Sequence, residues 1–166
     1  MPEKPYLPPY RLTDKIIHLI AEISEKAGLV SVNSAIATNP KLRKENQIRS
    51  IHSSLAIENN SLSLEQVTDV INGKLVLGPP NEIREVKNAY EAYNIMLTLN
   101  PYSIRDILKA HKIIMAGLSK EAGVFRSGSV GIFAGKKLVH MAPKSSFVPE
   151  LMRNLTNWLK DSDSHP

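Results

Sequence analysis

The feature that most constrains the fold of this sequence is a change of hydrophobic periodicity in its last third. Apolar residues recur at helical spacing along most of the chain, but between residues 129 and 142 they recur at about every second position. The runs 129–133 and 138–141 flank a turn at 134–137, and Pro143 follows. This pattern predicts a single β-hairpin. The expected fold class is therefore mainly α, a bundle of about six helices with one hairpin.

Local cap and stop signals set the expected limits of the helices. Thr13 is a suitable N-cap, Pro40 fits a first helical turn, and Ser63 opens a capping box. Gly28 and Gly73 are expected to end helices. The helices that these signals and the apolar spacing predict cover about residues 13–28, 40–60, 63–73, 82–99, 103–117 and 148–159.

Apolar stripes on three of these helices predict the core. Each stripe repeats every three or four residues, which places its members on one helical face. The side chains expected to be buried are Ile48, Ile51 and Leu55 in the second helix, Ile83, Val86, Tyr90, Tyr93 and Leu97 or near neighbours in the fourth, and Leu151, Leu155, Trp158 and Leu159 in the last.

Composition excludes several classes of function. The 166 residues are 42% hydrophobic and 22% charged, and their net charge of +5 is spread along the chain, so we expect no nucleic-acid partner. There are no cysteines, and the histidines lack metal-ligand spacing; His52 and His111 are expected to be half-buried helix residues. Without a long apolar run we expect neither a membrane span nor a signal peptide, and a cytoplasmic location.

Glu58 lies where a carboxylate is locally unfavourable. It falls in the last turn of the helix expected over 40–60, where the negative pole of the helix dipole favours a cation. Ser54 precedes it by four residues and shares its face. Taken alone, this spacing fits a solvated Glu followed by Asn59 as a C-cap. Local conflicts of this kind also gather at functional sites.

The residues around Glu58 resemble a known family. Ser54-x-x-x-Glu58-Asn59 resembles the inhibitory motif (S/T)xxxE(G/N) of Fic proteins, and the run 85–93, EVKNAYEAY, resembles the family helix written EvxNxxxAy. Gly123-Val124-Phe125-Arg126 and Val130-Gly131-Ile132 resemble the segment that leads into and forms the family's flap. The resemblance continues through the helix at 149–159 and covers nearly the whole chain in order.

This resemblance implies a fold, a chemistry and a regulatory mechanism. Fic enzymes transfer AMP from ATP, bound with Mg²⁺, to a hydroxyl group of a target protein. In members with this motif, the glutamate pairs with the arginine that binds the γ-phosphate and so blocks productive placement of ATP. Glu58 would be that inhibitory carboxylate, Ser54 the supporting hydroxyl, and Asn59 the residue that ends the helix.

The hairpin has an implied role as well. Val130, Gly131 and Ile132 would form the edge of the flap to which a target segment adds as an extended strand. A hairpin that only covers the core is the alternative. Arg126 is either an anchor for the flap or a surface charge, and the sequence leaves both interpretations open.

One departure from the family is large. The catalytic motif HPFx(D/G)GNGRxxR is absent, and His165-Pro166 follows a polar segment instead of an apolar helix, so it is not the start of that motif. No catalytic residue, resident metal or bound ATP is therefore expected in this chain.

Two hypotheses follow. In the first, residues 1–100 are the inhibitory region and 101–166 the beginning of the Fic core of an autoinhibited adenylyltransferase, truncated before its catalytic motif. In the second, the chain is a stand-alone module that inhibits a separate Fic enzyme, as antitoxin partners of this family do. We also expect the missing helices to leave an apolar face open, which would favour a homo-oligomer.

Overall fold

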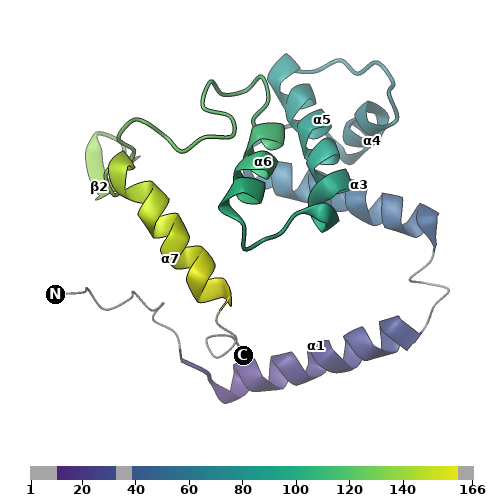
Figure 1. Ribbon diagram of the computed structural model, residues 1–166. Helices are drawn as coiled ribbons and strands as arrows, with labels where there is room; N and C mark the ends of the chain where they lie inside the picture. The colour runs from purple at the N-terminus through teal and green to yellow at the C-terminus, as the bar shows by residue number, and fades with distance from the viewer. Residues whose placement is uncertain (1–10, 33–38, 161–166) are drawn as a thin grey trace. The chain divides into compact units, whose positions relative to one another are not determined.

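The computed structural model describes residues 11–32 and 39–160 and divides the chain into two compact units, residues 1–47 and 48–166 (Figure 1). Its described part contains six α-helices, two short 3₁₀ helices and one two-stranded antiparallel sheet. This confirms the expected fold class. His165-Pro166 lies outside the described residues.

The first unit contains helix α1 (Asp14–Val32) and the first half of helix α3 (Pro40–Ile57). The Thr13 hydroxyl accepts a hydrogen bond from the amide of Ile16, at 3.3 Å, as expected for an N-cap. Gly28 does not end α1, which corrects the sequence-based expectation. A glycine within a helix costs only about 1 kcal/mol, and the neighbouring turns supply enough hydrogen bonds to continue through it.

The second unit is built around the C-terminal half of α3, helix α4 (Leu64–Ile71) and helix α5 (Pro80–Ile95), which lie next to one another in Figure 1. The capping box predicted at Ser63 is present, with both reciprocal hydrogen bonds. Their shared core consists of Ile48, Ile51, Leu62, Val67, Val70 and Val86, with Leu55, Ile83, Tyr90 and Tyr93 packed against it. The apolar stripe of the second helix is therefore confirmed.

Helix α6 (Ile104–Ile114) follows a 3₁₀ helix, η1 (Met96–Thr98), and packs on α5. The buried Asn88 of α5 fastens the two helices, because its side-chain amide donates to the carbonyls of Ile114 and Ala116, both at 2.9 Å. Leu97 was expected in the core, but it is 92% exposed. The chain leaves the α-helical path at Met96, and the tighter 3₁₀ turn points the Leu97 side chain outward.

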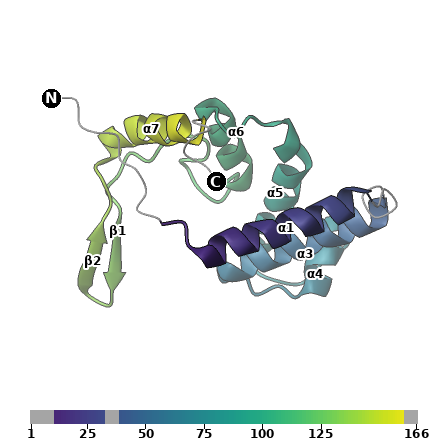
Figure 2. The same cartoon turned by 90° about the horizontal axis from the view of Figure 1, so that it is seen from below.

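The hairpin lies between α6 and the last helix. Strands β1 (Gly131–Ala134) and β2 (Lys137–Met141) pair antiparallel, and a second 3₁₀ helix, η2 (Ser145–Phe147), leads into α7 (Val148–Lys160). Figure 2 shows the hairpin extending from the start of α7. Leu151 and Leu155, expected to be buried, are 46% and 44% exposed. They are partly uncovered because the main packing partners of α7 among the described elements are α6 and the short η2.

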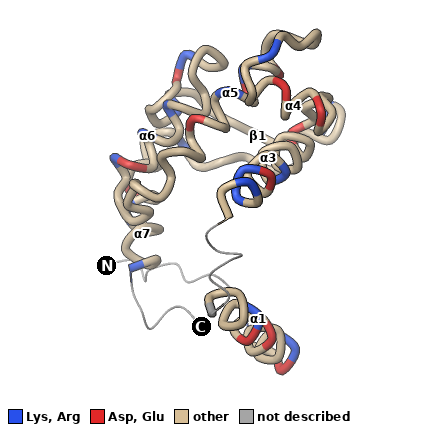
Figure 3. The backbone as a smooth tube through the Cα atoms, turned by 90° about the vertical axis from the view of Figure 1, so that its right-hand side faces the viewer, with Lys and Arg blue, Asp and Glu red and all other residues tan. Residues whose placement is uncertain are grey.

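Charge is mixed over the described helices. Figure 3 shows basic and acidic segments together on α5 and α6, whereas α3 is mostly basic and α4 carries acidic segments alone. None of the helices in residues 11–32 and 39–160 combines the length and the apolar character needed to span a bilayer.

Candidate functional site

The end of α3 is closed by a defined C-cap motif. The helix ends at Ile57, and the amides of Asn59 and Asn60 turn back to the carbonyls of Ala56 and Leu55, at 3.1 and 3.0 Å. These two bonds are the pair that defines a Schellman motif. Glu58 is therefore the C-cap residue, one position beyond the last helical turn in which the sequence placed it. Asn59 has φ +67°, the left-handed conformation that the motif requires.

Asn59 was expected to end this helix, and its conformation confirms that structural role. Most side chains are strained at positive φ, whereas Asn tolerates it better than other non-glycine residues. It is the only non-glycine residue with positive φ among residues 11–32 and 39–160. Its role in an ATP site stays a prediction.

The residues just after Glu58 are fastened to α5. Asn60 is only 8% exposed, and its side-chain amide donates to the carbonyl of Glu82 at 3.1 Å and to the carboxylate of Glu85 at 2.8 Å. Its side-chain oxygen accepts from the amide of Leu62 at 3.1 Å. The amide and hydroxyl of Ser61 both donate to the carboxylate of Glu82, at 2.6 and 2.8 Å.

Glu58 itself is exposed, and so is Ser54 one turn earlier on α3. Among the described residues, no Lys or Arg lies within salt-bridge distance of the Glu58 carboxylate. The backbone at Glu58 is thus held on both sides, by the helix before it and by the Asn60 and Ser61 contacts after it. The result is a solvent-facing carboxylate on a fixed support.

The second predicted site, the hairpin, is largely exposed. Val130, just before β1, is 50% exposed, and Ile132 and Phe133 on β1 are 62% and 60% exposed. A register shift between Ile132 and Phe133 opposes three residues of β2, His140 to Leu138, to two of β1. Because two residues of one strand face three of the other, the shift is a β-bulge, and Val139 has no partner on β1. The edge of β1 is therefore the more regular one.

Gly131 was selected from the sequence for close approach of a target strand. The structure supplies a reason within the hairpin itself. A Cβ on Gly131 would lie 2.8 Å from the Cδ1 of Leu138 and 3.4 Å from the ring of Phe133. Glycine at this position lets these two side chains close over the strand.

Arg126 is an anchor for the hairpin, which decides between the two interpretations that the sequence left open. Its guanidinium donates to the carbonyl of Gly128, at 2.7 Å, and to that of Pro143. Gly128 precedes β1 and Pro143 follows β2, so one side chain ties together both ends of the hairpin. Arg126 is half-buried, consistent with a structural role.

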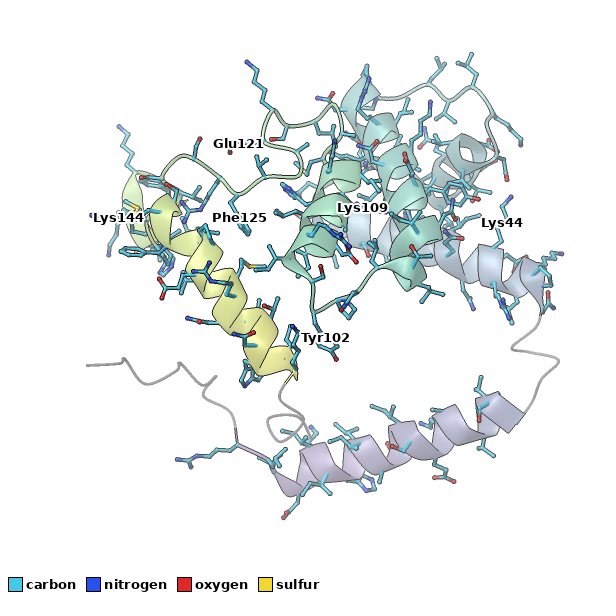
Figure 4. All side chains as sticks on the ribbon, in the orientation of Figure 1. Lys44, Tyr102, Lys109, Glu121, Phe125 and Lys144 are labelled. Carbon is cyan, nitrogen blue, oxygen red and sulfur yellow. The ribbon has the colours of Figure 1, made fainter. Side chains whose placement is uncertain are left out.

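A second group of polar contacts, which the sequence did not reveal, braces the same loop. The carboxylate of Glu121 accepts from the amide and the hydroxyl of Ser127, at 2.8 and 2.6 Å, and the Ser145 hydroxyl donates to the Ser127 carbonyl at 2.9 Å. The hydrogen bonds from the side chain and backbone of Ser127 lower the pKa of Glu121. Figure 4 places Glu121 and Phe125 on the loop before the hairpin and Lys144 just after it.

The space beneath this loop is mostly apolar. A groove of about 350 Å³ lies between α6 and the loop, and its lining includes Ile107, Leu108 and Phe125. His111 borders it, and its Nδ1 accepts a hydrogen bond from the amide of Gly123 at 3.0 Å. His111 and His52 are both half-buried, as expected, and His111 holds the loop in place. Residues 11–32 and 39–160 contain no group of side chains suited to binding a metal ion.

Comparison with known proteins identifies the relationship. No family model matches the chain. It is 24% identical over 153 residues to the protein adenylyltransferase Fic of Drosophila willistoni and 25% identical over 153 residues to that of Drosophila erecta, in each case 86% of this chain and 30% of the relative. The crystal structure of a Fic family protein from Desulfovibrio desulfuricans G20 matches 97% of this chain with a TM-score of 0.88 and 51% identity.

The chain is related to the Fic family. The match with the solved Fic protein confirms the Fic-like arrangement of helices and hairpin. The chain spans 50% of that protein and about 30% of the curated adenylyltransferases. The division at residue 100 and the roles of Ser54, Glu58, Asn59, Val130, Gly131 and Ile132 remain predictions.

Proposed function

We propose that this chain is the regulatory and target-binding part of a Fic-type protein adenylyltransferase, which transfers AMP from ATP to a hydroxyl group of a target protein. The observation that carries the proposal is the exposed carboxylate of Glu58 on a Schellman-capped helix end, fixed to α5 through Asn60 and Ser61. The relationship to named adenylyltransferases supports the transferred group.

In this proposal Glu58 is the inhibitory residue of the enzyme, called the brake from here on. Its carboxylate would pair with the arginine that binds the γ-phosphate of ATP and take up the charge that this arginine offers to the nucleotide. A carboxylate and a guanidinium can form two parallel hydrogen bonds, so such a pair is directional as well as strong. A rigid support makes the pairing effective, because little conformational entropy is lost when the carboxylate binds. Ser54, on the same helical face, would support it.

In this proposal ATP and Mg²⁺ would be held outside the described residues. They contain no metal-binding cluster, and Glu58 would repel a phosphate rather than hold one. The nucleotide would be held by the family's catalytic motif, which these 166 residues lack. The contribution of this chain to the reaction is thus control by Glu58 and presentation of the target.

The hairpin would present the target. Gly131 and Ile132 lie on β1 and Val130 directly precedes it, and an extended segment would add to this edge through main-chain hydrogen bonds. Arg126 ties together the two ends of the hairpin through the carbonyls of Gly128 and Pro143. An isolated two-stranded hairpin is marginally stable in water, so this anchoring is needed to keep the edge ready for binding.

The test is AMP transfer by the complete gene product with labelled ATP. Glu58→Gly and Glu58→Gln should raise labelling at least about tenfold, because either change removes the charge that competes for the arginine. Glu45→Gln, an exposed carboxylate of the same helix, is the matched control and should leave labelling unchanged. Equal labelling of all four proteins would refute the brake.

The antitoxin-like hypothesis gives a different result in the same assay. If this chain acts on a separate enzyme, the gene product alone transfers no AMP, and adding it to a Fic enzyme freed of its own brake lowers labelling. The presence of the hairpin and of the helices that support it favours the first hypothesis, because inhibition in trans needs little more than the inhibitory helix.

A further inference from the structure

The buried side chain of Asn60 is the unusual polar feature next to the brake. It is 8% exposed, and all three of its side-chain hydrogen bonds go to different residues. Buried polar groups cost stability unless they are satisfied, and a fully satisfied one fixes a unique conformation. An asparagine here provides two donors toward α5 and one acceptor toward the turn, a combination that neither Asp nor Leu can supply.

The partner of Asn60 on α5 is itself fixed. Glu85 lies one helical turn before Asn88, whose side-chain amide is bonded to the two carbonyls at the end of α6. Val86, between them, is fully buried in the core. The Glu85 carboxylate therefore accepts from Asn60 on a helix that is anchored on two sides.

We propose that Asn60 is a positioning residue for the brake: its hydrogen bond to Glu85 holds the turn that carries Glu58, and losing that bond releases the inhibitory carboxylate. This inference rests on the proposed function and adds to it the contact through which α5 controls Glu58. Glu58 is two residues before Asn60, and the Asn60 amide closes the helix by bonding to Leu55. A shift of Asn60 thus moves the C-cap directly.

The chemistry of the contact suggests the decisive variant. In Asn60→Asp a carboxylate oxygen replaces the amide nitrogen at nearly the same volume. That oxygen would face the Glu85 carboxylate and the Glu82 carbonyl, where the nitrogen now donates at 2.8 and 3.1 Å. Two like charges at this distance repel, so the turn must move away from α5. In Glu85→Gln, by contrast, an oxygen that accepts from Asn60 remains.

The complementary pair restores a donor. In the double variant Asn60→Asp with Glu85→Gln, the glutamine amide can donate to the new aspartate, so one hydrogen bond is recovered with its direction reversed. Asn81→Asp is the matched control, because it adds the same charge at an exposed position in the first turn of α5 and leaves Asn60 intact.

The first readout is AMP transfer by the complete gene product, with Glu58→Gly as the benchmark for a released brake. We expect Asn60→Asp to raise labelling about tenfold, the double variant to return to within a few-fold of the unmodified protein, and Asn81→Asp to change nothing. Global unfolding would abolish AMP transfer, so a gain of activity cannot come from it. If Glu58→Gly raises labelling but Asn60→Asp does not, the positioning role is refuted while the brake stands.

If Glu58→Gly does not raise labelling, the brake and this inference fail together. The second readout is independent of activity and uses the 166-residue chain. In Asn60→Asp, the backbone amides of position 60 and Ser61 should exchange hydrogen with solvent at least about tenfold faster. The exchange rate of the Val67 amide in α4 should not change. Unchanged exchange at Asn60 and Ser61 would show that the Glu85 contact does not hold the turn.

Discussion

Replacing Ile51 by alanine should destabilise the inhibitory helix more than any exposed change in it. Ile51 is 0% exposed and packs in the core with Val67 and Val86, which are also fully buried. The substitution removes three carbon groups, worth about 0.8 kcal/mol each in lost burial. A residual cavity of about 50 Å³ adds about 1 kcal/mol. The expected loss of unfolding free energy is therefore about 3 kcal/mol.

A loss of this size is a large share of the free energy of unfolding of a domain with so small a core, since domains are stable by only about 5–15 kcal/mol. It should lower the melting temperature by about 10 °C for a chain of this length. Urea unfolding followed by circular dichroism measures the change in free energy. Ile57→Ala is the matched control, because Ile57 lies on the same helix and is 79% exposed. It should change stability by less than about 0.5 kcal/mol.

Equal effects of the two substitutions would refute the reasoning, because burial is the only large difference between the positions. A loss below about 1 kcal/mol for Ile51→Ala would do so as well. It would mean that the helix does not depend on the core formed with α4 and α5. In that case the fixed position of Glu58 would need another source.

Three further predictions concern the turn and the hairpin. Asn59→Gly should leave stability unchanged or raise it slightly, whereas Asn59→Val should lower it by about 1–2 kcal/mol, because φ +67° is strained for a branched side chain; thermal melts compare them. The lowered pKa of Glu121 means that its bonds to Ser127 are complete above the ordinary Glu pKa of about 4.3 and are lost as the pH falls through the lowered value. The Ser127 amide signal in NMR should follow that titration in the unmodified protein but not in Glu121→Gln, and a midpoint above 4.3 would contradict the contact. Arg126→Gln should speed hydrogen exchange in both strands of the hairpin, and unchanged exchange would show that the guanidinium is not its anchor.

Much of the local structure could be read from the sequence because it depends on neighbouring residues. Ser63 caps α4 in the predicted capping box, and Thr13 accepts from the amide of Ile16 at the start of α1. The two-residue period of the hairpin segment reflects the alternation of side chains in a strand and identified both strands. Asn59 was recognised as a C-cap for the same reason, since its conformation is set by the helix it follows.

Errors appeared where burial depends on distant parts of the chain. Leu151 and Leu155 have the spacing of a buried stripe, yet whether a stripe is covered depends on which elements reach it. Leu97 has the right spacing for α5 but lies after the helix has changed to a 3₁₀ turn. Periodicity identifies the face of a helix that can be buried, and the tertiary structure decides which faces are.

The sequence by itself determined where most helices begin, that one hairpin interrupts them, and that Glu58 stands at a helix end. Only the tertiary structure decided what holds that end in place. Asn60 and Glu85 are 25 residues apart, and Arg126 and Pro143 are 17 apart. Such contacts join segments that no local pattern connects, because their distance in space is set by how α3, α5 and the hairpin loop pack. Helix caps and hydrophobic periodicity depend on a few adjacent residues, whereas these contacts depend on the whole fold.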